Sequence, residues 1–209
     1  VFNPQKAEEL KIPKQIDPRI AKMADYVEKK GDYTVVLYND RKVLYKEAFD
    51  AFRIIDRAYS KLYGTVPLTE RVIKSFIDAY IPLVNLDYIC SIKDKEGNMI
   101  AFGIVVPSIA KALKKSNGKL SPFGLLKMLK ALKGKNDLLE MYLVAVEAQY
   151  QLQGVPALLM CTLLKNVIAN GVEYCETGPM LETNTAVHSM WRHFEKEQHK
   201  RRRCFIMEI

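Results

Sequence analysis

Apolar and polar positions along the first half of the chain change between strand-like and helical spacing. Strand-like runs occur at 33–38, 88–92 and 99–106, and the turn DKEGN predicts that the last two form a hairpin. Between the first two runs, apolar residues recur at helical spacing and predict helices over 47–63 and 69–83. The pattern in this half therefore predicts the order strand, helix, helix, strand, strand.

The second half is organised around one stretch in which a strand pattern turns into a helix pattern. An apolar run at 138–146 is followed by a polar turn at 147–153, by Gly154 and Pro156, and by helical spacing as far as Asn170. Such a stretch can hold an anion, because the turn directs backbone N–H groups at the ligand and the helix dipole favours negative charge. The remaining elements expected are a strand over 172–177, a helix over 185–196 and a last strand over 204–209.

Residues 1–32 differ from the rest of the chain, because they are charged and contain three prolines. We expect a linker followed by a lead-in helix that Asp17 caps and Gly31 ends. We also expect this segment to be the end of a further N-terminal part, so that the domain itself covers 33–209.

Charge adds a local feature to this picture. The 209 residues carry a net charge of +8, yet the interval 97–136 contains no acidic residue. Taking its eight lysines from the 32 basic residues of the chain leaves 24, equal to the 24 acidic residues. The basicity therefore belongs to one insert, 107–136, and a general nucleic-acid-binding surface is not expected. A second basic run, 200–203, is interpreted as the solvated start of the last strand. The lysines of the insert are Lys111, Lys114, Lys115, Lys119, Lys127, Lys130, Lys133 and Lys135.

The insert has two interpretations. Two helical pieces flank the loop SNGKLSP, and the second piece carries one apolar stripe with lysines off it. The first interpretation is a helix packed on the sheet with a solvated basic face. The second is a flap that recruits an anionic partner, such as a phosphate-bearing cofactor, an acyl carrier protein or a membrane surface. The stripe consists of Leu125, Leu126, Met128, Leu129 and Leu132.

Cysteine and histidine positions predict no metal site. The four cysteines show no CxxC spacing, and the three histidines lack matched cysteine or carboxylate partners. We therefore expect free thiols and a cytoplasmic location, in preference to disulfides. No run of 18 apolar residues occurs, so no membrane span is expected, and the first residues do not resemble a signal peptide.

The turn at 151–157 has the sequence QLQGVPA, which matches the pattern Arg/Gln-x-x-Gly-x-Gly/Ala at Gln151 and Gly154. Pro156 stands where Gly or Ala is usual; it is tolerable in a first helical turn but removes one N–H donor. With the order of strands and helices, this motif resembles that of the GNAT acyltransferase superfamily over 33–209. The resemblance implies an α/β (α+β) fold with a mixed, mostly antiparallel sheet, helices on both faces, and splaying between the fourth and fifth strands.

The resemblance also implies that an acyl-CoA, either acetyl-CoA or a longer one, lies in this opening as co-substrate, with no metal. Splayed strands leave unpaired backbone groups, which the amides of pantetheine can satisfy like an added strand. The N–H of Val146 would stabilise the oxyanion, although LVAV also fits a plain core strand. The cofactor residues implied are Val144, Ala145 and Val146 for pantetheine, Gln151, Leu152, Gln153, Gly154, Val155, Pro156 and Ala157 for pyrophosphate, and Asn184 nearby.

Two catalytic positions follow from the same resemblance. Glu140 lies eleven residues before Gln151, which matches the spacing of the base in histone-acetylating members, and Glu176 is the alternative base. A carboxylate at an exposed strand end is an equally good interpretation of Glu140. The family often places a Tyr on the last helix as general acid, but the register from Asn184 gives Trp191, so that role is vacant.

The resemblance is closest to a bacterial group of this superfamily that shares the basic insert and the ending FEKEQHKRRRCFIMEI. Members of that group are about twice as long, and a further domain precedes the shared part. The sequence therefore predicts an N-acyltransferase acting on a small-molecule or peptide amine by direct attack. Two alternatives stay open: a non-catalytic acyl-CoA-binding module, and a binder of anionic surfaces through the insert.

Overall fold

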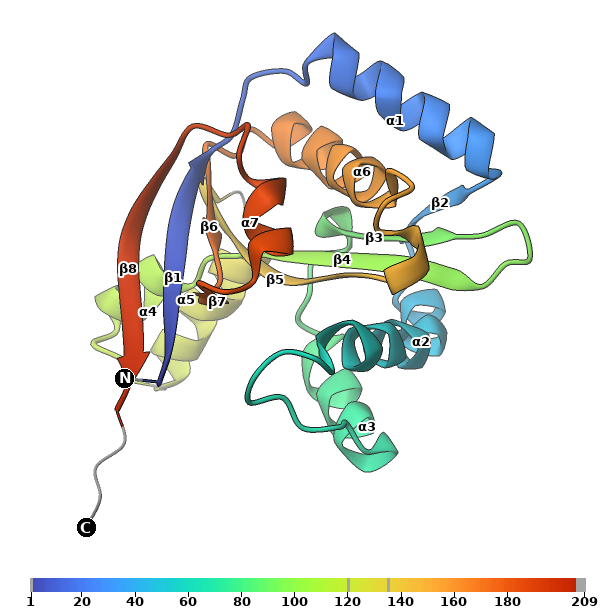
Figure 1. Ribbon diagram of the computed structural model, residues 1–209. Helices are drawn as coiled ribbons and strands as arrows, with labels where there is room; N and C mark the ends of the chain where they lie inside the picture. The colour runs from blue at the N-terminus through green and yellow to red at the C-terminus, as the bar shows by residue number, and fades with distance from the viewer. Residues whose placement is uncertain (1, 120, 135, 206–209) are drawn as a thin grey trace.

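The structure is a computed structural model that describes residues 2–119, 121–134 and 136–205, and its strands form one mixed sheet (Figure 1). Neighbouring strands follow the order β2-β3-β4-β5-β6-β1-β7, and β8 also pairs with β1. Among the described pairs only β5 and β6 run parallel, so the mixed, mostly antiparallel sheet is confirmed. The strands are β1 (Phe2–Lys11), β2 (Thr34–Leu37), β3 (Ile89–Lys93), β4 (Met99–Pro107), β5 (Leu138–Val146), β6 (Tyr174–Thr177), β7 (Met180–Leu181) and β8 (Lys196–Cys204).

Helices cover both faces of the sheet, as the sequence predicts. Figure 1 shows α1 (Pro18–Gly31) and α6 (Val155–Ala169) on one face, called the upper face here. It shows α2 (Arg41–Tyr59) and α3 (Glu70–Tyr80) on the other, the lower face. Each pair of helices closes over its own core of buried apolar side chains. The shorter helices are α4 (Ala110–Lys115), α5 (Pro122–Lys133) and α7 (Thr185–Met190), with 3-10 turns η1 (Leu86–Tyr88) and η2 (Ala148–Tyr150).

The two helices on the lower face begin at side-chain caps. The Asp40 carboxylate accepts a hydrogen bond from the Lys42 N–H, and the Thr69 hydroxyl accepts one from the Val72 N–H. The first of these helices therefore begins six residues before the predicted start at 47, and it ends at Tyr59 instead of 63. The chain between the two helices, 60–69, becomes a loop that is longer than the sequence pattern predicted.

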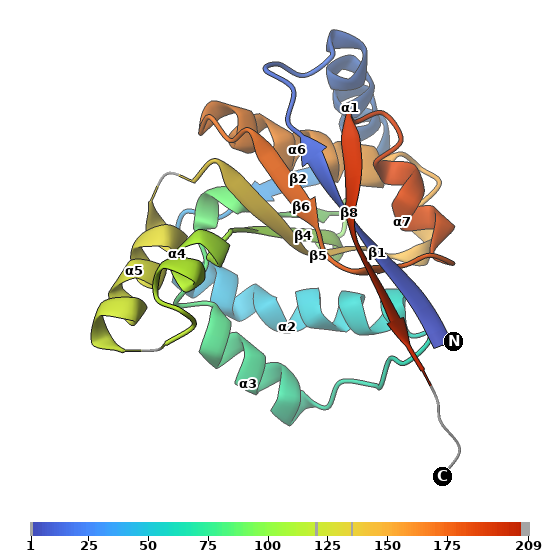
Figure 2. The same ribbon diagram turned by 90° about the vertical axis from the view of Figure 1, so that its left-hand side faces the viewer.

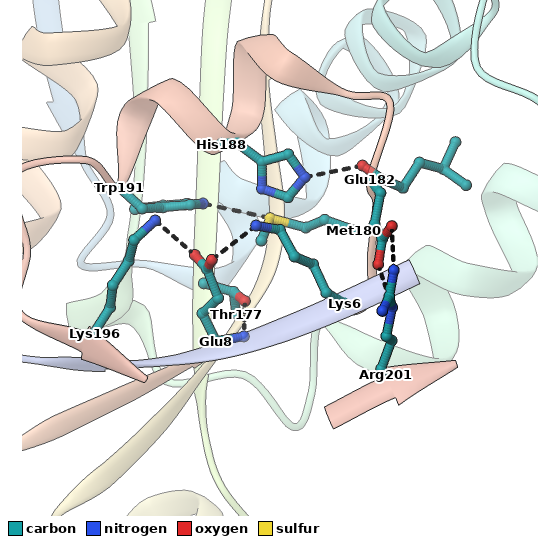
Figure 3. Close-up of polar contacts among 10 residues, drawn as sticks. Lys6, Glu8, Thr177, Met180, Glu182, His188, Trp191, Lys196 and Arg201 are labelled. Atoms are coloured by element: carbon teal, nitrogen blue, oxygen red, sulfur yellow. Dashed lines mark hydrogen bonds and ion pairs between the residues drawn. The ribbon is translucent and has the colours of Figure 1, made fainter. Parts of the chain in front are cut away.

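The linker expected within residues 1–32 is wrong for residues 2–11, which form β1 between β6 and β8. Charge compensation makes this possible, as Figure 3 shows. The side chain of Glu8 is 5% exposed, and its carboxylate oxygens lie 3.1 Å from Lys6 Nζ and 3.0 Å from Lys196 Nζ. Burial raises the pKa of this carboxyl, but the two lysine hydrogen bonds outweigh it and leave the pKa below its usual value. The helix expected after the linker is confirmed, with Asp17 as its cap.

The last strand begins earlier than predicted. The basic run 200–203 lies within β8, whose nine residues are all exposed, and residues 206–209 of the predicted strand lie outside the described part of the chain. The guanidinium of Arg201 donates two hydrogen bonds to Glu182, at 2.7 and 2.9 Å (Figure 3). The preceding helix ends at Met190, six residues before the predicted end at 196.

The insert forms two helices, α4 and α5, that pack against each other at one end of the sheet (Figure 2). The predicted apolar stripe of α5 is only partly correct. Met128 is buried, but Leu125 and Leu126 are 49% and 62% exposed, and Phe123 is 77% exposed. The ε-ammonium of Lys111 contacts the Asp137 carboxylate at 2.6 Å, whereas Lys135 lies outside the described residues. None of the described insert residues lines either of the two cavities described below.

Candidate active site

The opening predicted between the fourth and fifth strands lies between β5 and β6. Their parallel ladder ends where Met141 pairs with Thr177, while β5 continues for five more residues. Residues 143–146 pair with β4 on one side, and no described strand pairs with them on the other. Tyr142 is the extra residue of a β-bulge, since Ile104 pairs with Leu143 and Val105 with Met141. The sheet therefore has an internal free edge, as splaying predicts.

Strand geometry decides which backbone groups of β5 face this free edge. The Glu147 N–H donates to the Ile100 carbonyl of β4 at 2.9 Å, so the alternating ladder turns the polar groups of Val144 and Val146 away from β4. Side chains hold both carbonyls. The Tyr59 hydroxyl donates to the Val144 oxygen at 3.0 Å, and Gln151 Nε2 donates to the Val146 oxygen at 3.0 Å.

The glycine turn opens α6 in the way the motif predicts. Gly154 is the N-cap with φ of 83°, a left-handed conformation that glycine adopts without a Cβ penalty, and no side chain caps this helix end. Pro156 sits in the first turn, where a missing N–H leaves no helical bond unmade. A Cβ at Gly154 would lie 2.7 Å from Val27 Cγ2 of α1, so the turn fits closely under that helix.

Side chains around the turn point in different directions. Leu152 is 99% exposed, whereas Val155 is fully buried and presents no surface to a ligand. Gln153 Oε1 accepts a hydrogen bond from the Tyr33 hydroxyl at 2.9 Å, and this contact fixes the turn to the start of β2.

A groove of about 1530 Å³ runs along α6 on the upper face. Four of the predicted cofactor residues line it: Gln151, Gly154, Pro156 and Ala157. The opposite wall comes from the chain before α1 and from the end of α7, and it includes the basic side chains of Lys14 and Arg192. Residues 144–146 do not line this groove directly, but Gln151 connects it to the edge of β5 through the bond to Val146.

A smaller pocket of about 370 Å³ lies on the lower face, between α2, the 60–69 loop, α3 and β5. Tyr59, which holds the Val144 carbonyl, is part of its wall. Burial raises the pKa of the Tyr59 hydroxyl more than its hydrogen bond to Val144 lowers it, so this group stays a protonated donor. The two edge carbonyls of β5 are thus held by side chains that line two different cavities.

Neither predicted base lines either of these cavities. Glu140 is on the lower face, because it pairs with Val106 of that face, and its carboxylate accepts a bond from Ser108 Oγ at 2.6 Å. It lies six residues from Val146 on one strand, a separation of roughly 20 Å, so the structure does not bring these two predicted residues together. Glu176 contacts Lys200 Nζ at 2.6 Å, an ion pair that occupies its carboxylate.

Trp191 is a core residue at the end of α7. It is 1% exposed, and its indole N–H points to Met180 Sδ at 3.4 Å (Figure 3). Its indole has no acidic O–H, and its burial keeps it away from solvent. Asn184 caps α7 by accepting a hydrogen bond from the Val187 N–H at 3.3 Å, and no contact tests its predicted role near a cofactor.

Three further properties of the described part of the chain concern its cysteines, its potential metal ligands and its potential membrane-spanning helices. The four cysteines are free, and burial raises the pKa of Cys90 and Cys175 to about 12. Within the described ranges no group of three or more His, Cys, Asp or Glu side chains could hold a metal ion. Of the described helices, none combines the length and apolarity needed to cross a bilayer.

Sequence reasoning missed three residues of this region. Tyr59, Asp56 and Arg57 all lie in a helix that the pattern predicts over 47–63, and nothing in that pattern singles them out. In the structure Arg57 Nε donates to the Glu147 carboxylate at 2.9 Å, directly after the edge of β5. Their clustering on α2 depends on which face of that helix meets β5, and the residue spacing alone does not contain this information.

Comparisons with known proteins give a relative in sequence and several in structure. No protein-family model matches the chain. Protein YghO of Escherichia coli (strain K12) is 29% identical over 198 residues, which are 92% of this chain and 50% of that protein. The chain therefore spans about half the length of the curated relative it matches.

Two solved structures illustrate the similarity in fold. A GCN5-related glucosamine N-acetyltransferase region of a fungal multi-domain GH3 beta-N-acetylglucosaminidase matches 96% of this chain and 20% of its own, with TM-score 0.52 and 9% identity. A GCN5-related N-acetyltransferase from Sphaerobacter thermophilus matches 94% of this chain and 51% of its own, with 11% identity and a TM-score, 0.47, too low to add weight. The sheet order, the free edge of β5 and the glycine turn agree with the first of these similarities: the chain has the fold of the GCN5-related N-acetyltransferase (GNAT) superfamily.

Proposed function

We propose that this domain transfers an acyl group from an acyl-CoA to an amine. One observation carries the proposal: the edge carbonyls of Val144 and Val146 are held by Tyr59 and Gln151, whose side chains line two different cavities. We place the donor in the groove along α6 and the acceptor in the pocket beside α2, so that each substrate lies against a side chain that holds this edge. A single-step transfer needs this arrangement, because both substrates must be bound at once.

The fit of an acyl-CoA rests on the chain's own backbone. Polar groups of Val144 and Val146 that face away from β4 can pair with the amides of pantetheine, as an added strand would. At the start of α6 the N–H group of Ala157, which lines the groove, has no helical acceptor, and the helix dipole favours the charge of a pyrophosphate. The groove lining contains both basic and acidic side chains, and among them Lys14 and Arg192 carry the charge that favours the same anion.

The reaction proposed is direct attack. The amine nitrogen bonds to the thioester carbonyl carbon, the C–S bond breaks, and CoA leaves as the thiol, while the ammonium form of the amine releases one further proton to water. An edge N–H of β5 stabilises the oxyanion of the tetrahedral intermediate. Because Trp191 is buried in place of a general acid, we assign protonation of the leaving thiolate to water.

A non-catalytic acyl-CoA-binding module is the second candidate, and the burial of Trp191 is the observation that favours it. Thiol release from acetyl-CoA, measured with a panel of primary amines, separates the two. Amine-dependent release above the rate of hydrolysis supports transfer. Binding of acetyl-CoA in calorimetry without release for any amine supports the module, and absence of both contradicts the two candidates together.

A further inference from the structure

The pocket beside α2 differs from the groove along α6 in its chemistry. Its volume of about 370 Å³ is at the small end of ligand pockets, which suits a small molecule better than a folded partner. Its described lining is aromatic and aliphatic, and Asp56 is the one charged side chain in it. The residues that line it are Phe52, Ile55, Asp56, Tyr59, Ser60, Thr65, Val66, Pro67, Leu68, Phe76, Tyr80, Tyr142 and Leu143.

Aromatic rings form a continuous row along this pocket. The rings of Phe52 and Phe76 stack with centroids 5.9 Å apart, Phe76 stacks on Tyr80 at 5.9 Å, and Tyr80 meets Tyr142 at 6.2 Å. The row therefore leads from α2 across α3 to the bulge residue of β5. Phe76, Tyr80 and Tyr142 remain 38%, 43% and 50% exposed, which leaves ring surface available to a ligand.

The charged side chain in the described lining of this pocket, Asp56, is negative. Asp56 Oδ1 accepts a hydrogen bond from the Leu68 N–H at 2.9 Å, a bond that positions the carboxylate and fixes the end of the 60–69 loop. Burial, the hydrogen bond with Tyr80 and the nearby charge of Glu140 all raise the pKa of Tyr142, so its ring is a neutral phenol at ordinary pH. Ring faces attract cations, and a carboxylate beside them adds a counter-charge.

On the basis of the function proposed above, we propose that this pocket binds the acceptor and selects a primary amine carried on an aromatic or similarly flat apolar body. The apolar body stacks on the rings of Phe76 and Tyr80, and the ammonium group lies near Asp56. Tyr59 connects the pocket to the Val144 carbonyl, so an amine bound there is next to the edge at which the thioester is expected. The structure offers no such aromatic row in the described lining of the groove along α6.

The test is a calorimetric titration of three matched probes into protein saturated with CoA. 2-Phenylethylamine has both the ring and the charge, 2-phenylethanol lacks the charge, and ethylamine lacks the ring. We expect 2-phenylethylamine to bind about tenfold tighter than either analogue. Equal affinities for all three probes would overturn the inference.

Two variants assign the effect to residues. Asp56→Asn keeps an oxygen for the Leu68 N–H but removes the charge, so it should weaken binding of the amine about fivefold or more and leave the alcohol unchanged. Phe76→Leu should weaken both ring-bearing probes and leave ethylamine unchanged. Phe123→Leu on the exposed surface of α5 is the control and should change nothing.

Other outcomes separate this inference from the function on which it rests. If acetyl-CoA binds and polar amines are acylated while aromatic amines are not, the acceptor class is wrong but the function holds. If Phe76→Leu weakens decanoyl-CoA more than 2-phenylethylamine, the pocket holds the acyl chain and the inference is wrong. Failure of acetyl-CoA to bind at all contradicts the proposed function itself.

Discussion

Gly154 gives the sharpest test of the turn that opens α6. Replacing it with Ala has two separable effects. A non-glycine residue at φ of 83° costs about 1–2 kcal/mol, and a Cβ placed 2.7 Å from Val27 Cγ2 forces that side chain to move, at about 1–3 kcal/mol. We therefore expect Gly154→Ala to lower the free energy of unfolding by about 2–5 kcal/mol. For a domain of this size that corresponds to a decrease in Tm of roughly 4–20 °C.

Gly171, just after the other end of the same helix, is a matched control. It has φ of 70°, and a Cβ at this position would meet no heavy atom within 4 Å, so Gly171→Ala should show the backbone cost alone. Chemical unfolding of both variants, and of Gly154→Ala combined with Val27→Ala, measures the energy of the contact with Val27 as a double-mutant cycle. The reasoning would be refuted if the two glycine variants were equally stable, or if Val27→Ala recovered none of the loss.

The remaining predictions concern the edge of β5, the buried charge of β1 and the end of α7. Tyr59→Phe should lower the free energy of unfolding in urea by about 1 kcal/mol, because the Val144 carbonyl loses its donor. An unchanged urea midpoint would contradict this hydrogen bond. The pKa of Glu8 is lowered in the folded state, so its stabilisation is complete above the usual value of 4.5 and is lost as pH falls through the folded pKa. At neutral pH the free energy of unfolding of Glu8→Gln should therefore be about 2 kcal/mol lower than that of the unaltered protein, and this difference should shrink toward zero in acid. A difference that stays constant from neutral to acidic pH would be inconsistent with this linkage. Trp191→Tyr should not give the ~100-fold gain in thiol release that a working general acid supplies, because the position is buried; such a gain would show that it reaches the leaving group.

The sequence predicted the strand, the glycine turn and the helix of 138–169 well, because these elements depend on local chemistry. A glycine that must adopt a left-handed conformation, a proline tolerated in a first turn and an apolar strand before them are all visible in 138–157. The expectation that both faces of the sheet carry helices came from the family resemblance. Pairing of β5 with its neighbours followed from the family resemblance and not from the spacing itself.

Contacts between residues that lie far apart in the chain explain the features that the sequence did not reveal. The segment FNPQKAEELK has no apolar alternation, and it becomes a strand because Glu8 meets Lys196 far along the chain. The pocket beside α2 is a similar case, since Asp56, Phe76 and Tyr142 come from three elements. Predicting either contact requires the packing of the whole domain. Exposure of Leu126 likewise depends on where α5 sits, which helical spacing cannot determine.

The proposed function requires this domain to bind acetyl-CoA, and a calorimetric titration measures that binding. We expect saturable binding with a dissociation constant in the range typical of enzyme substrates, about 1 µM to 1 mM. Gly154→Val, which places a branched side chain against Val27 at this turn, should weaken binding at least about tenfold. Gly97→Ala, at a left-handed turn that lines neither cavity, should not change it. No heat of binding for the unaltered domain, or equal affinity for Gly154→Val when that variant is folded, would contradict the assignment of this turn.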